Sequence, residues 1–393
     1  MLQLYRLEVG KLVRRASFAA GALLFAAIAV MIYAGRVDLF GRKLYLVDED
    51  GTLLHGREAL RLEQELADRY GGALTDDKLK EIAQLAHWNE RQRETFEQYG
   101  SQIGYPYIYY LISCYFLRKN SITVRTGSLE SRSVTSIELS DDSAIPLRRI
   151  ADVFPDSVLP MRLAYSLPWS GMLESMILNL LGLGLLMFFI VVPAFSEERM
   201  HKMNALLFTS KLGKKKCFLA KAAAAYSLGI VFAVAVILLH VLVTFAFFGD
   251  DGLSGSIQIA DMYSEYQDLP YVKTVGGAIL DAAVFYTADV MFAVSISLLG
   301  SVLAPNLLMG IVLSAVLWAA PAVVIFLKSV SEQVRLLAPA AHLTGFSSVL
   351  SMPEVTIFSV TIPYSYAAAG ILLLLSGLIL MFAAGSYRRI TGE

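Results

Sequence analysis

Six long apolar runs constrain this chain more than any other feature of its sequence. A helix needs about 20 mostly apolar residues to cross a hydrocarbon core that is about 30 Å thick. Inside lipid every backbone amide must be hydrogen-bonded within its own segment, so runs of this length fold as helices. The runs predict six transmembrane helices, over residues 17–35, 171–195, 218–249, 274–303, 305–327 and 363–386.

The composition agrees with a chain that faces lipid. Of its 393 residues 56% are hydrophobic and 17% are charged, whereas soluble domains are about 45–50% apolar and about 25% charged. A net charge of −1 favours neither nucleic acid nor an acidic partner. The two cysteines, Cys114 and Cys217, form no disulfide framework, and no cysteine or histidine spacing is typical of a metal site.

The charge of the connecting segments predicts the orientation. Residues 1–16 and the loop 196–217 are rich in Lys and Arg, and the tail 387–393 contains two arginines. The loop 250–273 is acidic instead. Because cytoplasmic loops carry the excess of basic residues, both termini are expected in the cytoplasm. The expected location is the plasma (cytoplasmic) membrane of a prokaryote, crossed several times.

A polar insertion, 36–170, separates the first two predicted spans. Apolar residues at helical spacing among many charges predict amphipathic helices over 57–70 and 76–99. The tyrosine-rich stretch 104–117 is too short for a seventh span, which would also invert every later loop, so we expect an external core or an aromatic belt there. The predicted fold is an all-α polytopic membrane protein with six transmembrane helices. A mostly helical α(+β) extracytoplasmic domain follows the first helix, and 328–362 forms a further external loop.

Motifs for enzymatic chemistry are absent from the sequence. There is no G-x-x-x-x-G-K-[ST] phosphate loop, no H-E-x-x-H and no G-x-S-x-G. The stretch 253–258 (LSGSIQ) is superficially like the signature of ABC ATPase domains, but it lies in the acidic loop that is predicted to be external. We expect no catalytic residue on this chain, and any energy from ATP must come from a partner.

The loop between the second and third predicted spans has a distinctive order of residues. After Phe195 it reads as an acidic pair, an arginine, an apolar patch, Thr-Ser and a basic cluster that ends at Lys221. One interpretation is an ordinary basic loop on the cytoplasmic side. The other is a short amphipathic helix just below the membrane, whose apolar patch enters a groove on a soluble partner while the lysines meet lipid phosphates.

This order of residues resembles the ABC-2 type permease family of ABC transporters. The resemblance extends to a basic amphipathic N-terminal segment, six helices and a cytoplasmic C-terminus. The insertion after the first helix is similar to the branch of the family with an enlarged external domain. The family commonly has Thr-Ser-Pro where this chain has Thr209, Ser210 and Lys211.

The resemblance implies the permease subunit of an exporter for a hydrophobic or amphipathic compound, such as a drug, a peptide or a lipid. A coupling helix at about 197–210 would dock on an ATP-binding subunit, and segment 8–15 would lie along the inner leaflet against lipid. Two permeases, identical or homologous, and two ATP-binding subunits would form the working unit. ATP and Mg would bind to the partner subunits, with no cofactor or metal on this chain. The implied coupling residues are Glu197, Glu198, Arg199, Leu206, Leu207, Phe208, Thr209 and Ser210.

Polar residues inside the predicted spans suggest a candidate substrate path. Asp281 and Asp289 lie eight residues apart in the fourth span, and Asn179 lies in the second. An ionisable group at this depth costs roughly 2.5–3.5 kcal/mol on insertion scales, so it usually faces a cavity or a partner. The alternative interpretation places Asp281 near the outer surface and makes Asp289 an interhelical hydrogen bonder.

Two other classes of function compete with a permease. A secondary transporter or channel could use Asp281 and Asp289 as coupling sites, but the inverted repeats typical of that class are not visible. A sensor or scaffold would be expected to carry a cytoplasmic signalling domain, and none is recognisable.

Overall fold

The chain folds mostly into helices. The computed structural model describes residues 2–42, 44–84, 89–99, 103–104, 106–109, 116, 147–200, 213–260, 269, 271–320, 354–357 and 360–390. These residues form two compact units. Unit 1 comprises Met1–Tyr33, Leu173–Leu242 and Ile279–Glu393, and unit 2 comprises Ala34–Met172 and Val243–Ala278.

Five helices of the described chain are long and apolar enough to cross a membrane, which makes this a multi-pass membrane protein by length and composition. They are α2 (Ala16–Arg36), α8 (Leu167–Val191) with its continuation α9 (Pro193–Met200), α11 (Gly213–Phe248), α12 (Val275–Leu303) and α15 (Tyr364–Ile390). Each overlaps one of the predicted spans. The predicted span 305–327 appears as the shorter helix α13 (Leu307–Ala319), because residues 321–353 lie outside the described part of the chain.

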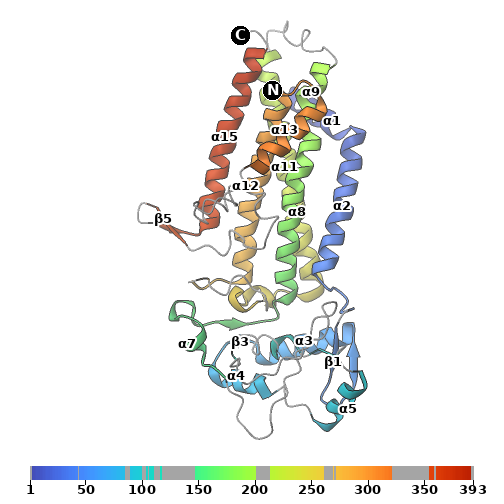
Figure 1. Cartoon of the computed structure of the whole chain (residues 1–393), viewed down its shortest axis with the longest axis vertical. Helices are drawn as coiled ribbons and strands as arrows, with labels where there is room; N and C mark the ends of the chain where they lie inside the picture. The colour runs from blue at the N-terminus through green and yellow to red at the C-terminus, as the bar shows by residue number, and fades with distance from the viewer. Residues whose placement is uncertain are drawn as a thin grey trace. The chain divides into compact units, whose positions relative to one another are not determined.

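The helices of unit 1 lie side by side, with α8 and α12 largely buried and α2 on the outside (Figure 1). The outer helices expose large apolar side chains: Leu23 and Met31 of α2 are 72% and 74% exposed, and Leu374 of α15 is 72% exposed. Such a surface suits hydrocarbon, since lipid tails are as apolar as leucine. Interior serines, among them Ser297 and Ser314, donate to carbonyls one turn earlier and so satisfy their own hydroxyls.

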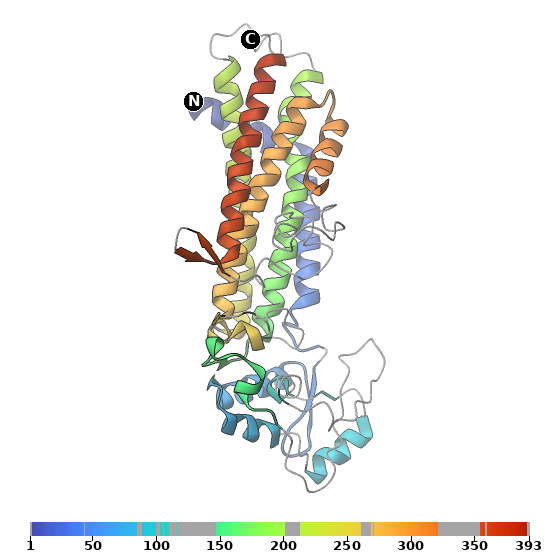
Figure 2. The same cartoon turned by 60° about the vertical axis from the view of Figure 1, so that its left-hand side comes forward.

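One end of unit 1 gathers three segments that are far apart in the sequence. The N-terminal helix α1 (Leu2–Val13), α9 and the last turns of α15 lie at the same end of the bundle (Figure 2). All of these belong to or adjoin segments that the charge rule predicts to be cytoplasmic. At the opposite end of α15 the described part of the predicted loop 328–362 is a hairpin, in which β5 (Val355–Ile357) pairs with β6 (Val360–Ile362).

Unit 2 contains the polar insertion. The helix predicted over 57–70 is α3 (Arg57–Tyr70), while the one predicted over 76–99 is divided into α4 (Asp76–Ala83) and α5 (Glu90–Tyr99). The division has a local cause, because Asn89 and Gln92 cap the start of α5 reciprocally. The Gln92 amide donates to Asn89 Oδ1 at 2.9 Å, and the Asn89 amide donates to Gln92 Oε1 at 3.0 Å. A continuous helix would lose both bonds.

The remaining elements of unit 2 are short. They are the antiparallel pairs β1 (Tyr45–Val47) with β2 (Leu53–His55) and β3 (Gly72–Ala73) with β4 (Arg162–Leu163), and the helical turns α7 (Ile150–Val153), η4 (Asp156–Val158), η5 (Asp251–Ser254) and η6 (Ile257–Ile259). Unit 2 has two apolar clusters: Tyr107, Ile108 and Phe116 are buried in the larger one, and Leu46 of β1 is buried in the smaller one. The tyrosine-rich stretch 104–117 therefore contributes core residues to unit 2, which favours the external-core interpretation over a seventh span.

Candidate functional site

A fully buried lysine near the start of α11 is the centre of an ion-pair network. Lys221 is 1% exposed, and its ammonium lies 2.6 Å from Glu198 Oε2 of α9 and 4.0 Å from Glu8 Oε2 of α1. It also donates to the Ala194 carbonyl oxygen and lies 4.7 Å from the centre of the Phe195 ring. Because a buried cation is costly unless it is paired and hydrogen-bonded, these contacts explain how a lysine is accommodated inside an apolar helix.

The N-terminal segment supplies the other cations, Lys11 from α1 and Arg15 from the link between α1 and α2. Lys11 Nζ lies 2.9 Å from Glu8 Oε1 and 3.5 Å from Glu198 Oε1, and Arg15 Nη2 lies 2.7 Å from Glu197 Oε2. Three carboxylates thus face three cations. We call this set, Glu8, Lys11, Arg15, Glu197, Glu198 and Lys221, the Lys221 network. It joins α1, α9 and α11 at the end of unit 1 from which the loop 201–212 departs.

The groups around Lys11 determine how its contribution to stability depends on pH. Burial lowers the pKa of the Lys11 ammonium, but the hydrogen bonds and charges of Glu8 and Glu198 outweigh burial and leave the pKa raised above its ordinary value of 10.5. A raised pKa means that the stabilisation is fully present below pH 10.5 and is lost as the pH rises through the folded-state value. Lys11→Gln should therefore lower the thermal midpoint of the full chain by the same amount at pH 6 and pH 9. A loss that differs between these two pH values would contradict this account.

Arg199 anchors α9 to the end of α12. Its Nη1 donates to the Ala304 carbonyl at 2.8 Å, and its Nη2 donates to the Val302 carbonyl. The last carbonyls of a helix lack intrahelical partners, and cations stabilise that end of the helix dipole. The backbone amide of Phe195 donates to Ser301 Oγ at 2.9 Å and adds a second link to α12. A displacement of α9 would therefore strain α12 as well as α1 and α11.

Aromatic rings pack on the other side of α9. The Phe195 ring stacks on Phe218 of α11 with centroids 5.5 Å apart, and Tyr387 of α15 lies 5.1 Å from Phe195. The contacts of α9 thus reach a fourth partner, α15, within unit 1.

The structure describes three of the eight predicted coupling residues. Glu197, Glu198 and Arg199 lie on α9, which begins at Pro193 directly after α8 instead of forming a separate helix from residue 197. All three bind other parts of the same chain. Leu206, Leu207, Phe208, Thr209 and Ser210 lie outside the described residues, so their predicted docking role stays a prediction.

Sequence reasoning treated α1 and the acidic pair as separate features and missed their contact. Two signals could have indicated it. A lysine, Lys221, lies three residues inside the apolar run that begins at Phe218, and Glu8 is the one acid in segment 1–16. Charges at the edge of lipid need partners, and these two have opposite signs.

The intramembrane aspartates face different helices. Asp289 is 0% exposed and its Oδ1 accepts from the Trp318 indole N–H of α13 at 3.2 Å, while its Oδ2 has no hydrogen-bond partner in the described part of the chain. Asp281 instead hydrogen-bonds Tyr366 of α15. The contact with Trp318 is the interhelical hydrogen bond that the alternative interpretation of Asp289 expected.

Asn179 hydrogen-bonds α2 and α11. Its Nδ2 donates to the Ala29 carbonyl of α2 at 3.3 Å and to His240 Nε2 of α11 at 3.0 Å. The His240 Nδ1 in turn contacts the Val236 carbonyl at 2.7 Å, and since a carbonyl only accepts, Nδ1 carries the proton. These hydrogen bonds of Asn179, Asp281 and Asp289 lead to different neighbouring helices, and their role in a substrate path stays a prediction.

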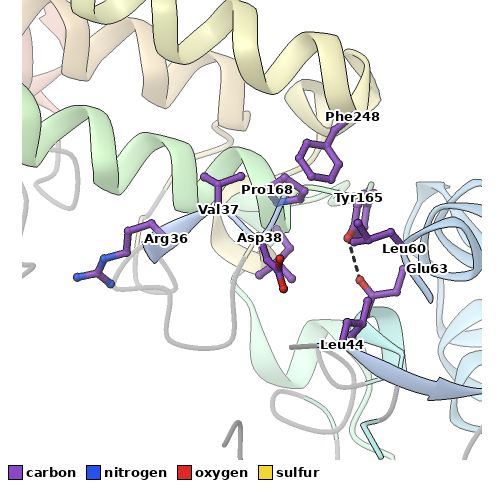
Figure 3. A pocket seen from close by; sticks show the side chains of 10 residues that line it. Arg36, Val37, Asp38, Leu44, Leu60, Glu63, Tyr165, Pro168 and Phe248 are labelled. Carbon is purple, nitrogen blue, oxygen red and sulfur yellow. Dashed lines mark hydrogen bonds between the residues drawn. The ribbon is translucent and has the colours of Figure 1, made fainter. Parts of the chain in front are cut away.

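Unit 2 contains a small pocket beside a buried carboxylate (Figure 3). Glu63 accepts from the Tyr165 hydroxyl at 2.8 Å and from the Tyr107 amide at 3.3 Å. Leu60, Pro168 and Phe248 are among the apolar side chains that line the cavity, whose volume is about 30 Å³. A cavity of about 10–15 Å³ holds one water, so the pocket has room for two or three waters and not for a transported compound.

Within the described ranges no three His, Cys, Asp or Glu side chains are grouped to hold a metal ion. The chain matches no protein-family model, no curated protein and no solved structure.

Proposed function

We propose that this chain is the permease subunit of an ABC transporter of the ABC-2 type, which exports a hydrophobic or amphipathic compound with energy from ATP hydrolysed by a separate subunit. Two copies, or one copy and a homologue, would join two ATP-binding subunits. ATP and Mg would be bound by those subunits, and the exported compound could be a drug, a peptide or a lipid. The protein would lie in the cytoplasmic membrane with both termini inside.

The Lys221 network is the observation that carries this proposal. A soluble motor can drive a membrane helix bundle only through a segment that is firmly joined to it. Residues 201–212, which contain the expected docking patch, directly follow α9, and α9 is bonded to α1 and α11 through Glu198 and to α12 through Arg199. Force applied to that loop would therefore reach several helices together. This supports a coupling role.

The test is capture of an ATP-binding partner. The probe is any soluble ATPase with a phosphate loop that proves to be encoded next to this chain, co-expressed with the full-length protein. Reversing Glu197 or Glu198 would break ion pairs within the chain itself, so Leu206→Asp with Leu207→Asp is the cleaner variant. We expect it to abolish co-purification, because a carboxylate cannot enter an apolar groove without a partner. Leu206→Met with Leu207→Met is the matched control and should still bind.

A secondary transporter is the second candidate, favoured by the unpartnered Asp289 Oδ2 in the described part of unit 1. It predicts flux across vesicles driven by an ion gradient, with the purified chain alone and without nucleotide. Such flux, lost on Asp289→Asn, would replace the ABC proposal.

A further inference from the structure

The outward face of α1 carries an unusual mixture of side chains. Leu2 and Leu7 are 62% and 61% exposed, and Val13 is 40% exposed. Arg6 is exposed on the same side of the helix, and so is Arg14, which directly follows α1 and continues its last turn through a hydrogen bond from its amide to the Gly10 carbonyl. At 100° per residue Leu2, Arg6 and Val13 fall within one narrow strip, and Leu7 and Arg14 form the strip beside it. The face is thus apolar and cationic together.

The opposite face of α1 packs against the rest of unit 1. Leu12 and Glu8 are 3% and 6% exposed, and Glu8, the one acid of the helix, pairs with Lys11 and lies near Lys221. The outward face therefore holds two arginines and no carboxylate. Neither arginine forms an ion pair within the residues that the structure describes.

The contacts of α1 with α11 set its level along the bundle. The Tyr5 hydroxyl donates to Ser227 Oγ at 2.9 Å, and Glu8 lies near Lys221. Both α11 residues belong to the apolar run that begins at Phe218, and six residues of helix separate them by about 9 Å. The N-terminal helix therefore lies beside the first turns of the candidate span Lys216–Phe248. Because this span is longer than a hydrocarbon core needs, we expect these turns, and the outward face of α1 with them, at the level of the lipid headgroups.

We propose that the outward face of α1 binds anionic phospholipid, with Arg6 and Arg14 on headgroup phosphates and Leu2, Leu7 and Val13 against the acyl chains. Arginine suits this role because its planar fork of donors matches phosphate oxygens. Helices that lie in the interface combine these two kinds of side chain. Lys11 and Arg15 of the same segment form ion pairs with Glu198 and Glu197 of α9. Lipid that fixes the position of α1 would therefore also fix the position of α9. This inference needs only a membrane-embedded chain and does not depend on an ATPase partner.

The experiment measures lipid binding to the full-length protein in neutral detergent by native mass spectrometry. Phosphatidylglycerol is the probe and phosphatidylcholine the reference lipid. We expect the wild-type chain to bind phosphatidylglycerol more tightly, and Arg6→Gln and Arg14→Gln each to weaken that binding about fivefold, since one basic residue near an anionic surface contributes about that factor. Both side chains are exposed, so the variants should fold.

The matched control removes two exposed arginines of unit 2, by Arg61→Gln with Arg93→Gln, and should leave the lipid preference unchanged. Equal binding of the two lipids by the wild-type chain would overturn the proposal and would indicate a protein partner for this face. An equal loss in the unit 2 control would overturn it too, because the preference would then reflect net charge alone. Neither result would affect capture of the ATP-binding partner by Leu206 and Leu207, so failure of one proposal is separable from failure of the other.

Discussion

Lys221→Met should destabilise unit 1 more than any other single substitution of a polar residue in it. The change removes the ammonium but keeps an unbranched side chain of similar length, so packing within α11 is largely preserved. In the wild-type chain Glu198 and Glu8 lie 2.6 Å and 4.0 Å from the Lys221 ammonium, and both carboxylates are largely buried. Without that ammonium, Lys11 would be the one cation of the network left to pair with them. Removing one partner of a buried ion pair costs about 3–5 kcal/mol, because it leaves an uncompensated charge. The thermal midpoint of the purified chain in detergent is the measurement.

The matched control for this prediction lies five residues earlier on the same helix. Lys216 is exposed, and Lys216→Met should change the midpoint little, since surface charges contribute about 0–1 kcal/mol. Glu198→Gln, introduced together with Lys221→Met, should recover part of the loss by removing the orphaned carboxylate. If the two lysine variants were equally stable, Lys221 would not be the centre of a buried network.

Trp318→Phe should produce the second-largest loss of stability, because it removes one hydrogen-bond donor from the interior of unit 1. Phenylalanine keeps an aromatic ring beside Phe188, whose centroid lies 6.2 Å from that of Trp318, but it removes the indole N–H that Asp289 Oδ1 accepts at 3.2 Å. Asp289 would then have no donor among the described residues, because its other oxygen has none already. An unsatisfied buried polar group costs about 1–3 kcal/mol, and more when it is charged. Thermal unfolding in detergent again reports the change.

A double-mutant cycle separates this hydrogen bond from the smaller volume of phenylalanine. In an Asp289→Leu background Trp318→Phe removes the same ring atoms but breaks no hydrogen bond with residue 289. The fall in thermal midpoint should then be smaller, because only the lost packing of the larger ring contributes to it. The same loss in both backgrounds would show that Trp318 stabilises α13 by volume only.

Local properties of the sequence accounted for much of the fold. Hydropathy over about 20 residues was sufficient to locate α2, α8, α11, α12 and α15, because a membrane span must satisfy its hydrogen bonds within its own segment. Helical periodicity predicted α3 with its observed ends, Arg57 and Tyr70. It joined α4 to α5, because the break depends on the reciprocal cap between Asn89 and Gln92, which apolar spacing does not reveal.

The sequence by itself determined which segments of this protein are long and apolar enough to cross a membrane and which residues carry the charges at their ends. Only the tertiary structure decided which charges meet. Glu198 and Lys11 are 187 positions apart, and no periodicity or loop composition relates residues at that separation. The acidic pair expected to face a soluble partner binds α1 and α11 instead, since a carboxylate near lipid is stabilised by the nearest cation that packing provides. Which helices provide those cations is a property of the packed bundle, and it is the physical reason that the Lys221 network could not be predicted from the sequence.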